Sequence, residues 1–347
     1  MLIIDSHAHA AMEEVLPVRF FDGWVDNLER LLPPGAPPSQ RDALTAMFRR
    51  LNQDPHCDKL IAEMDRAGIA RTVLLIVDFA FAYLDQPDLL HKVYAIHREL
   101  MQRHPGRFIV FAGIDPRRGP AGQELVEQAL RDWGFRGLKI YPPCGYSPDA
   151  EELYPYYGLC EKYRVPVLSH IGPTSPSLSF RYTRPGDIED AAFRFPKVNF
   201  ILGHAGVVWR QEAGMLAAFR PNVYMDLSGF QPDWRRGGLD SILLEHKRNG
   251  LLRKLLFGTD WPIHRIQGGQ KQWVDAFIDC AARGILTDEE LGWIFYDNAA
   301  QILGEPSRVS LAAGACTNDS SKSQQQMEKE IQHDHHHRHR HRAAERS

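Results

Sequence analysis

Short apolar runs rich in Val, Ile, Leu and Phe recur along the chain. They read LIIDSHAH, RTVLLIV, RFIVFAGI, FRGLKIY, VPVLSH, VNFILGH, NVYMDLS and KLLFGTD. Amphipathic stretches of helical length, including DKLIAEMDRAG and AGQELVEQALRDWG, lie between them. Because strand-like and helix-like segments alternate, the pattern predicts βα units that share one parallel sheet.

The number of these units predicts a fold of the α/β class, a (β/α)8 TIM barrel. Such a barrel typically needs about 250 residues, and residues 1–304 supply that length and one insertion. The insertion spans approximately residues 10–57, where WVDNLERLL and RDALTAMFRRL look helical on either side of the breaker PPGAPPS. A helical insertion after the first strand would lie over the active-site end of the barrel, as a lid, a dimer contact or a structural hairpin.

Residues 305–347 differ from the rest in composition. They contain the polar stretch NDSSKSQQQMEKE followed by HDHHHRHRHRAAERS, which predicts a disordered, His-rich tail. A flexible run of imidazoles is expected to bind transition metals. A purification tag is the alternative interpretation, but Asp334, Arg338 and Arg340 interrupt the histidines, which favours a native tail.

The composition argues against several classes of function. The formal net charge is -3 and the body has no basic stripe, so nucleic acid is not an expected partner. No apolar run approaches the ~18 residues of a membrane span, and MLIIDSHAHA lacks the features of a signal peptide. Five cysteines without CxxC spacing indicate reduced thiols. We expect a cytoplasmic protein without a membrane partner that acts on a small molecule.

Five imidazole or carboxylate groups end predicted strands. His7 and His9 end the first run, and His170, His204 and Asp260 end the fifth, sixth and eighth. Side chains two apart on a strand share a face, so the first two imidazoles would enter the barrel mouth together. The C-terminal ends of barrel strands form the ring where active sites are built. Such a cluster is costly unless a cation neutralises it, and these donors suit a divalent metal such as zinc.

The same residues carry a resemblance to a known family. A strand-one HxH, a strand-five His, a strand-six His and a strand-eight Asp resemble the metal site of the amidohydrolase superfamily. The wording of IIDSHAHA, VPVLSHIG, NFILGHAG and LLFGTDWP is similar to the amidohydrolase-related branch, which includes aminocarboxymuconate-semialdehyde decarboxylase. The resemblance implies a divalent metal, usually zinc, bound by His7, His9, His170 and Asp260. It implies that His204 is a second-metal ligand or a catalytic proton carrier.

Asp260 and His204 are therefore the expected catalytic residues. Asp260 would coordinate the metal and accept a proton from bound water, and His204 would donate to the leaving group or stabilise an oxyanion. Lys139 in GLKIYPP stands where some superfamily members carry a carboxylated lysine that bridges two metals. It could instead remain an ammonium that binds a substrate carboxylate or pairs with an acid. We predict an uncarboxylated Lys139 and a single metal.

Other polar residues are weaker candidates, and none is assigned a catalytic role. Candidates for lining the pocket, for orienting an imidazole or for binding a carboxylate are Tyr141, Trp209, Trp261, His264, Asp5, Arg49, Arg50, Arg181 and Arg184. The histidines expected at the surface are His56, His91, His97, His104 and His246.

Two reactions fit this constellation. The leading expectation is a hydrolase that cleaves a C–N or C–O bond, as in an amide or lactone, through metal-activated water. The alternative is non-oxidative decarboxylation of an unsaturated or aromatic carboxylic acid, because a Lewis acid can serve either reaction. A second alternative, a non-catalytic metal-binding protein, is motivated by the His-rich tail. Related barrels often form dimers, so a homodimer is left open.

Overall fold

A closed ring of parallel strands organises the protein. The computed structural model describes residues 1–30, 32–33, 37–83 and 89–311. Eight strands are hydrogen-bonded in chain order from β1 to β8. Their bounds are β1 Ile4–Ala8, β2 Arg71–Leu75, β3 Phe108–Gly113, β4 Leu138–Ile140, β5 Val167–Ser169, β6 Phe200–Leu202, β7 Val223–Asp226 and β8 Leu255–Leu256. The Ser6 amide donates to Phe257 O (2.8 Å), and Ala8 pairs with Trp261. These contacts join β1 to the chain beyond β8, and the (β/α)8 prediction is confirmed.

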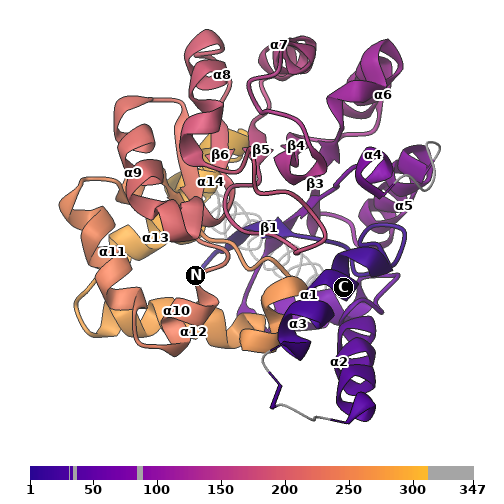
Figure 1. Ribbon diagram of the computed structural model, residues 1–347. Coiled ribbons are helices and arrows are strands. Elements are labelled where there is room, and N and C mark those ends of the chain that lie inside the picture. Colours follow the sequence, from indigo (N-terminus) through magenta and orange to yellow (C-terminus); the bar gives the residue numbers. More distant parts are fainter. Residues whose placement is uncertain (31, 34–36, 84–88, 312–347) are drawn as a thin grey trace, which may run out of the picture. The chain divides into compact units, whose positions relative to one another are not determined.

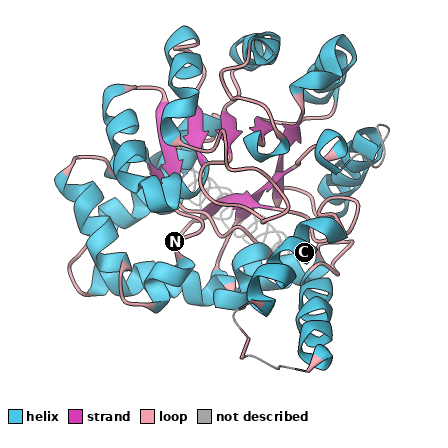
Figure 2. Cartoon of the chain, in the orientation of Figure 1, coloured by secondary structure: helices cyan, strands magenta, loops and turns pink. Residues whose placement is uncertain are grey.

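Helices surround the strands (Figures 1 and 2). Their bounds are α1 Val18–Glu29, α2 Pro38–Leu51, α3 Asp58–Ala67, α4 Ala80–Tyr83, α5 Leu89–Arg103, α6 Gly119–Asp132, α7 Tyr154–Tyr163, α8 Glu189–Arg194, α9 Arg210–Phe219, α10 Gln231–Arg235, α11 Leu239–Arg248, α12 Gln270–Ala282, α13 Asp288–Gly292 and α14 Asn298–Leu303. Parallel strands covered by helices are buried on both faces, which explains why each reads as a nearly continuous apolar run.

Alternate residues of the strands belong to two different apolar clusters. Val73 and Leu75 of β2 belong to a cluster that also includes residues of α14. Leu74, between them, belongs to the larger cluster that includes the surrounding helices. This alternation separates the barrel interior from the layer between sheet and helices. The polar site described below therefore stands at the end of a packed apolar interior.

The predicted helical insertion after the first strand is present. It contains α1 and α2, and α2 begins at Pro38, inside the breaker PPGAPPS, because proline is well suited to the first turn of a helix. The insertion packs as a helix pair, with α1 against α2. Most of the predicted disordered tail, residues 312–347, lies outside the described residues. The metal-binding role of the tail falls on the same residues and stays a prediction.

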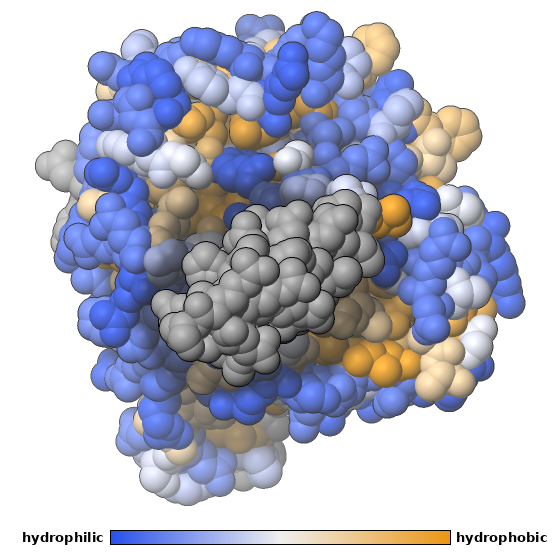
Figure 3. All heavy atoms as spheres, turned by 180° about the vertical axis from the view of Figure 1, so that it is seen from behind, coloured by the Kyte–Doolittle hydropathy of each residue, from blue (hydrophilic) through white to orange (hydrophobic). Residues whose placement is uncertain are grey.

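On the face of the described chain seen in Figure 3, hydrophilic residues predominate, and hydrophobic residues form separate patches between them. None of the described helices combines the length and apolar character that crossing a bilayer requires. His97 and His246 were expected at the surface, but that prediction is wrong, because both are buried. The helices α5 and α11 place these imidazoles inside the protein. Tertiary packing determines which side of a helix is buried, and the local sequence does not reveal it.

Candidate active site

Two histidines of the first strand point into the barrel mouth with fixed ring orientations. The Nδ1 atom of His7 lies 3.0 Å from Asp226 Oδ2, and Nδ1 of His9 lies 2.8 Å from the carbonyl oxygen of Leu75. A carbonyl or an ionised carboxylate can only accept, so each Nδ1 carries the proton. The Nε2 lone pairs are left free, at 3.6 Å and 3.5 Å from Asp260 Oδ1.

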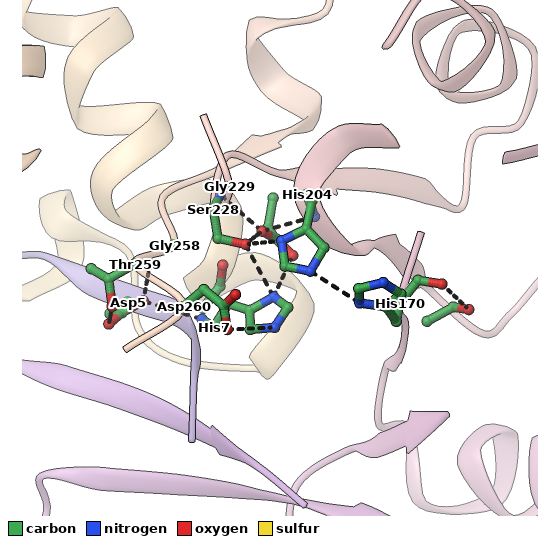
Figure 4. A network of polar contacts seen from close by, with 12 residues as sticks. Asp5, His7, His170, His204, Ser228, Gly229, Gly258, Thr259 and Asp260 are labelled. Carbon is green, nitrogen blue, oxygen red and sulfur yellow. Dashed lines mark hydrogen bonds and ion pairs between the residues drawn. The ribbon is translucent and has the colours of Figure 1, made fainter. Parts of the chain in front are cut away.

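His170 and His204 follow β5 and β6 and face each other (Figure 4). Nε2 of His170 lies 3.2 Å from Gly172 O and therefore donates to it, which leaves Nδ1 free. That Nδ1 lies 3.1 Å from Nε2 of His204. The other nitrogen of His204, Nδ1, lies 2.9 Å from Ser228 Oγ. The free Nδ1 of His170 and the Nε2 of His204 thus face each other at the barrel mouth.

His204 and Asp260 both have left-handed backbone conformations. Their φ angles are 62° and 50°, values that are uncommon for residues with a side chain. Such conformations cluster at functional sites, where surrounding structure holds them in place. Here each one turns the chain sharply where a strand ends, and both side chains are buried at the site.

Burial keeps the imidazoles of the site neutral. It lowers the pKa of His9 and of His170 to about 3, and it lowers the pKa of His7 and His204 well below 6.5, with nearby Lys139 or histidines acting in the same direction. Burial also raises the pKa of Asp260, which Lys139 partly opposes. Neutral imidazole is the form that binds metal, and a cation would restore the charge of the carboxylate.

These donors fit a divalent cation. Ligand atoms of His7, His204 and Asp260 all lie within 4.8 Å of one another. The neighbouring donor atoms described above are separated by 3.1 to 3.6 Å. Four ligands placed tetrahedrally at about 2.1 Å from zinc would be about 3.4 Å apart. The spacing of His7, His204 and Asp260 therefore suits one ion. The other two predicted ligands each lie beside one member of this group, His9 beside Asp260 and His170 beside His204. The role of His204 as a ligand or a proton carrier stays a prediction.

Lys139 lies beneath this cluster without a direct polar partner. Its side chain is 1% exposed, and its Nζ has no hydrogen-bond partner among the described residues. Burial lowers the pKa of Lys139 to about 8, and Asp226 and Asp260 oppose the shift. Tyr141 covers the ammonium, with the ring centroid 5.6 Å from Nζ. Lys139 is thus a buried cation whose charge is balanced by the carboxylates of Asp226 and Asp260.

A cavity of about 220 Å³ opens onto the donor groups. Its polar end consists of His7, His9, His170, His204, His264 and Asp260, and its apolar walls include Leu16, Phe20, Trp24, Val77, Phe79, Tyr141, Ile171, Val207 and Ile263. No lysine or arginine occurs among the described residues that line it. A larger cavity of about 410 Å³ beside α1 contains none of the predicted ligands.

The weaker sequence candidates divide into two groups. Tyr141 and His264 line the cavity, whereas Trp209, Trp261 and the four arginines do not. Asp5 contacts no imidazole in the described structure. It accepts hydrogen bonds from the Thr259 amide (2.9 Å) and hydroxyl (2.6 Å) and thereby ties β1 to the chain after β8. The sequence interpretation missed Asp226, although its position at the end of β7 follows the same strand-end rule as the predicted ligands.

Comparison with known proteins gives the family and the reactions of relatives. A family model described as Amidohydrolase matches residues 4–304. Gamma-resorcylate decarboxylase from a Rhizobium species is 23% identical over 225 residues, which cover 50% of this chain and 65% of that protein. Protein fluG from Emericella nidulans is 29% identical over 131 residues, or 36% of this chain and 15% of that protein. The chain thus spans less than two thirds of the length of these relatives.

Solved structures show the same fold. The 5-carboxyvanillate decarboxylase of Novosphingobium aromaticivorans, complexed with manganese and 4-hydroxy-3-methoxy-5-nitrobenzoic acid, matches with a TM-score of 0.64 and 15% identity, over 87% of this chain and 96% of that chain. The 2,6-dihydroxybenzoate decarboxylase of Rhizobium matches with a TM-score of 0.60 and 18% identity, over 87% of this chain and 98% of that chain.

These comparisons overturn the prediction of a hydrolase. Gamma-resorcylate decarboxylase and the two matching enzymes of known structure are named for decarboxylation, the reaction that the sequence left as the alternative. The physical reason for the error is that both reactions use the same imidazole and carboxylate ligands around a Lewis acid. Residues at strand ends therefore identify the metal site without identifying the bond that breaks.

Proposed function

Because this chain belongs to the amidohydrolase family, we propose that it is a metal-dependent enzyme that decarboxylates a small aromatic or unsaturated acid. The observation that carries the proposal is the cavity, in which a donor-rich end faces apolar and aromatic walls. An acidic group would occupy the donor end, and a planar hydrocarbon part would pack against the walls. The named decarboxylases among the relatives support this reaction.

We propose one divalent ion, held by His7, His9, His170 and Asp260. Zinc suits this mixture of imidazole and carboxylate, and manganese is the ion in the complex of 5-carboxyvanillate decarboxylase. When bound, the ion supplies a Lewis acid that neutralises carboxylate charge and polarises a substrate oxygen. Lys139 stays uncarboxylated in this proposal, because its charge compensates the buried Asp226 and Asp260.

In this proposal the substrate is an acid with one ring and one carboxylate, which the size and charge of the cavity favour. A volume of about 220 Å³ accommodates a single substituted ring. The rings of Phe20, Phe79 and Tyr141 supply flat apolar surfaces beside it. A second carboxylate at the far end would meet no basic side chain among the described lining residues and would lose its hydration without compensation.

His204 is the proposed proton carrier. Decarboxylation breaks the bond between the ring carbon and the carboxyl carbon, the electron pair stays on the ring carbon, and carbon dioxide leaves. That carbon then takes a proton, which the protonated Nε2 of His204 can give from the cavity wall. Because burial keeps the resting ring neutral, Nε2 takes this proton from solvent before it passes the proton to the ring carbon, and the ring is neutral again after each turnover.

A product assay tests the proposal. Full-length protein loaded with manganese or zinc is incubated with carboxyl-labelled benzoates, hydroxybenzoates and unsaturated acids in deuterated water. We expect labelled carbon dioxide and a product with one deuterium at the former carboxyl position. Isophthalates, which carry a second carboxylate, should react at least about 10-fold more slowly than matched benzoates, the equivalent of about 1.4 kcal/mol. Failure of every acid to release carbon dioxide from protein that holds one ion per chain contradicts the proposal.

A further inference from the structure

The buried carboxylate of Asp226 contacts His7, His204 and Ser228 of the site. Asp226 ends β7 and is completely buried. Its Oδ1 atom accepts from the backbone amides of His204 (3.2 Å) and Ser228 (3.0 Å), and it also accepts from the Ser228 hydroxyl. Its Oδ2 atom accepts from Nδ1 of His7 at 3.0 Å. Every one of these partners donates, so Asp226 acts only as an acceptor, which is the role of an ionised carboxylate.

The single hydroxyl proton of Ser228 determines which ring nitrogen of His204 carries a proton. Ser228 Oγ lies beside Asp226 Oδ1, 2.9 Å from Nδ1 of His204 and 3.2 Å from Nδ1 of His7. An ionised carboxylate cannot donate, so the hydroxyl proton goes to Asp226. The oxygen of Ser228 must then accept from Nδ1–H of His204. This arrangement leaves the lone pair of His204 on Nε2. The Nδ1 atom of His170, 3.1 Å away, also carries a lone pair, so the two nitrogens are stable face to face only with a cation or an added proton between them.

The surroundings leave Ser228 little room to move. A Cβ atom on Gly258 would lie 3.1 Å from Ser228 Cβ and 3.2 Å from Asp226 Oδ1. A Cβ atom on Gly229 would lie 3.2 Å from Nδ1 of His204, and the φ of Gly229 is +87°. Both glycines therefore allow the backbone to pack directly against this group. Figure 4 shows Ser228 between Gly229 and the rings of His7 and His204.

We propose that Asp226 and Ser228 are positioning residues that fix the tautomers of His7 and His204. Asp226 holds His7 directly, so that Nε2 is free for the cation. It holds His204 through Ser228, so that Nε2 is free to carry a proton. The carboxylate of Asp226 thus orients both a metal ligand and the proton carrier. The catalytic roles of these two histidines rest on the proposed function. Outer partners of this kind typically change metal affinity or activity by about 10- to 100-fold when they are removed.

The direct test reads the tautomers without any reaction. The full chain is labelled with ¹⁵N on its histidine rings and loaded with diamagnetic zinc, and the His204 signal is assigned by its loss in His204→Gln. We expect His204 to carry its proton on Nδ1 in the wild type and to shift toward Nε2–H in Ser228→Ala. The control is Ser6→Ala, which removes a buried hydroxyl that donates to Phe257 O at 2.7 Å. A wild-type His204 with its proton on Nε2 overturns the proposal. This measurement uses the wild-type protein, so it does not depend on whether Ser228→Ala folds.

Two further measurements separate positioning from a loss of structure. Ser228→Ala should bind one ion per chain with unchanged affinity but turn over about 10- to 100-fold more slowly at an unchanged KM. Asp226→Asn should weaken metal binding by a similar factor, because His7 loses its acceptor. Equal losses in Ser228→Ala and Ser6→Ala would overturn the proposal. If no acid is decarboxylated by the wild type, the proposed function fails while the tautomer and affinity results still decide the positioning roles.

Discussion

At the scale of single residues, His204 combines a strained backbone with a buried, neutral ring. Its φ of 62° brings the imidazole into the cavity wall, and burial lowers its pKa well below 6.5. The ring has one neighbour on each side, Ser228 at Nδ1 and His170 at Nε2. A side chain held in this way is suited to moving a proton.

We predict that His204→Asn retains the metal and loses most of its activity. Asn preserves polarity and approximate size, but it cannot carry a proton, and acid–base catalysis commonly supplies about 100- to 10,000-fold. Metal analysis and steady-state turnover on the same preparation check this. His170→Ala is the comparison, since it should lose both metal and activity. Unchanged turnover in His204→Asn would exclude the proton-carrier role.

The residues of the site differ in how far the sequence could predict them. His7, His9, His170, His204 and Asp260 could be recognised because imidazole and carboxylate groups rarely end apolar strands without a reason. Asp226 sits inside the run NVYMDLS, and its meaning depends on the ring of His7, 219 positions away in the sequence. The contacts that fix ring tautomers arise only when the barrel brings the ends of β1, β6 and β7 to the same mouth, so spacing alone does not reveal them.

At the scale of elements, α1 of the insertion packs tightly against the segment that follows β5. Phe20 and Trp24 of α1 line the cavity. On the same helix, a Cβ on Gly23 would lie 2.4 Å from Ser175 Oγ and 2.9 Å from the Ser177 amide nitrogen. The absence of a side chain at position 23 therefore allows α1 to pack over the cavity. The lid, dimer-contact and structural roles of the insertion stay predictions.

We predict that Gly23→Ala raises KM by about 10-fold, which corresponds to about 1.4 kcal/mol of binding free energy, while metal content stays the same. The added methyl group must displace α1 or the segment at Ser175, and the aromatic wall of the cavity moves with the helix. The matched control is Gly158→Ala in α7, where a Cβ would meet no atom within 4 Å. That variant should have wild-type kinetics. A wild-type KM in Gly23→Ala would contradict the role of this close contact.

At the scale of the whole molecule, buried histidines make the fold sensitive to acid. His97 lies in α5 and is not one of the predicted ligands, and burial lowers its pKa from 6.5 to about 4. The unfolded chain therefore binds a proton at this position more readily than the folded chain. The stability that this neutral imidazole contributes is present above about pH 6.5 and is lost as the pH falls toward about 4.

We predict that His97→Gln reduces the acid sensitivity of folding. Between about pH 7.5 and pH 5, His97 alone should lower the free energy of unfolding by about 2 kcal/mol. Urea denaturation of both proteins at the two pH values measures this difference. His91→Gln is the control, because His91 is an exposed residue of the same helix. An equal pH dependence in His97→Gln and the wild type would show that this imidazole does not contribute.

We also predict that removal of the divalent ion lowers the melting temperature of the whole barrel unit. An ion present at about 100 times its dissociation constant stabilises the folded state by about 2.7 kcal/mol. Calorimetry before and after dialysis against a chelator, with metal content measured in both samples, checks this. An unchanged melting temperature after complete loss of the ion would mean that the site forms equally well without it.

The join between β1 and the chain after β8 brings together residues from opposite ends of the barrel sequence. His7 accepts the amide of Asp260 at 2.7 Å through its carbonyl oxygen, and His9 donates its own amide to Trp261 O at 2.7 Å. During synthesis the first strand is made long before its partner, so these contacts form last. A nascent chain can acquire its ion with full affinity only once the ring has closed, and metal retention then reports that the barrel was completed.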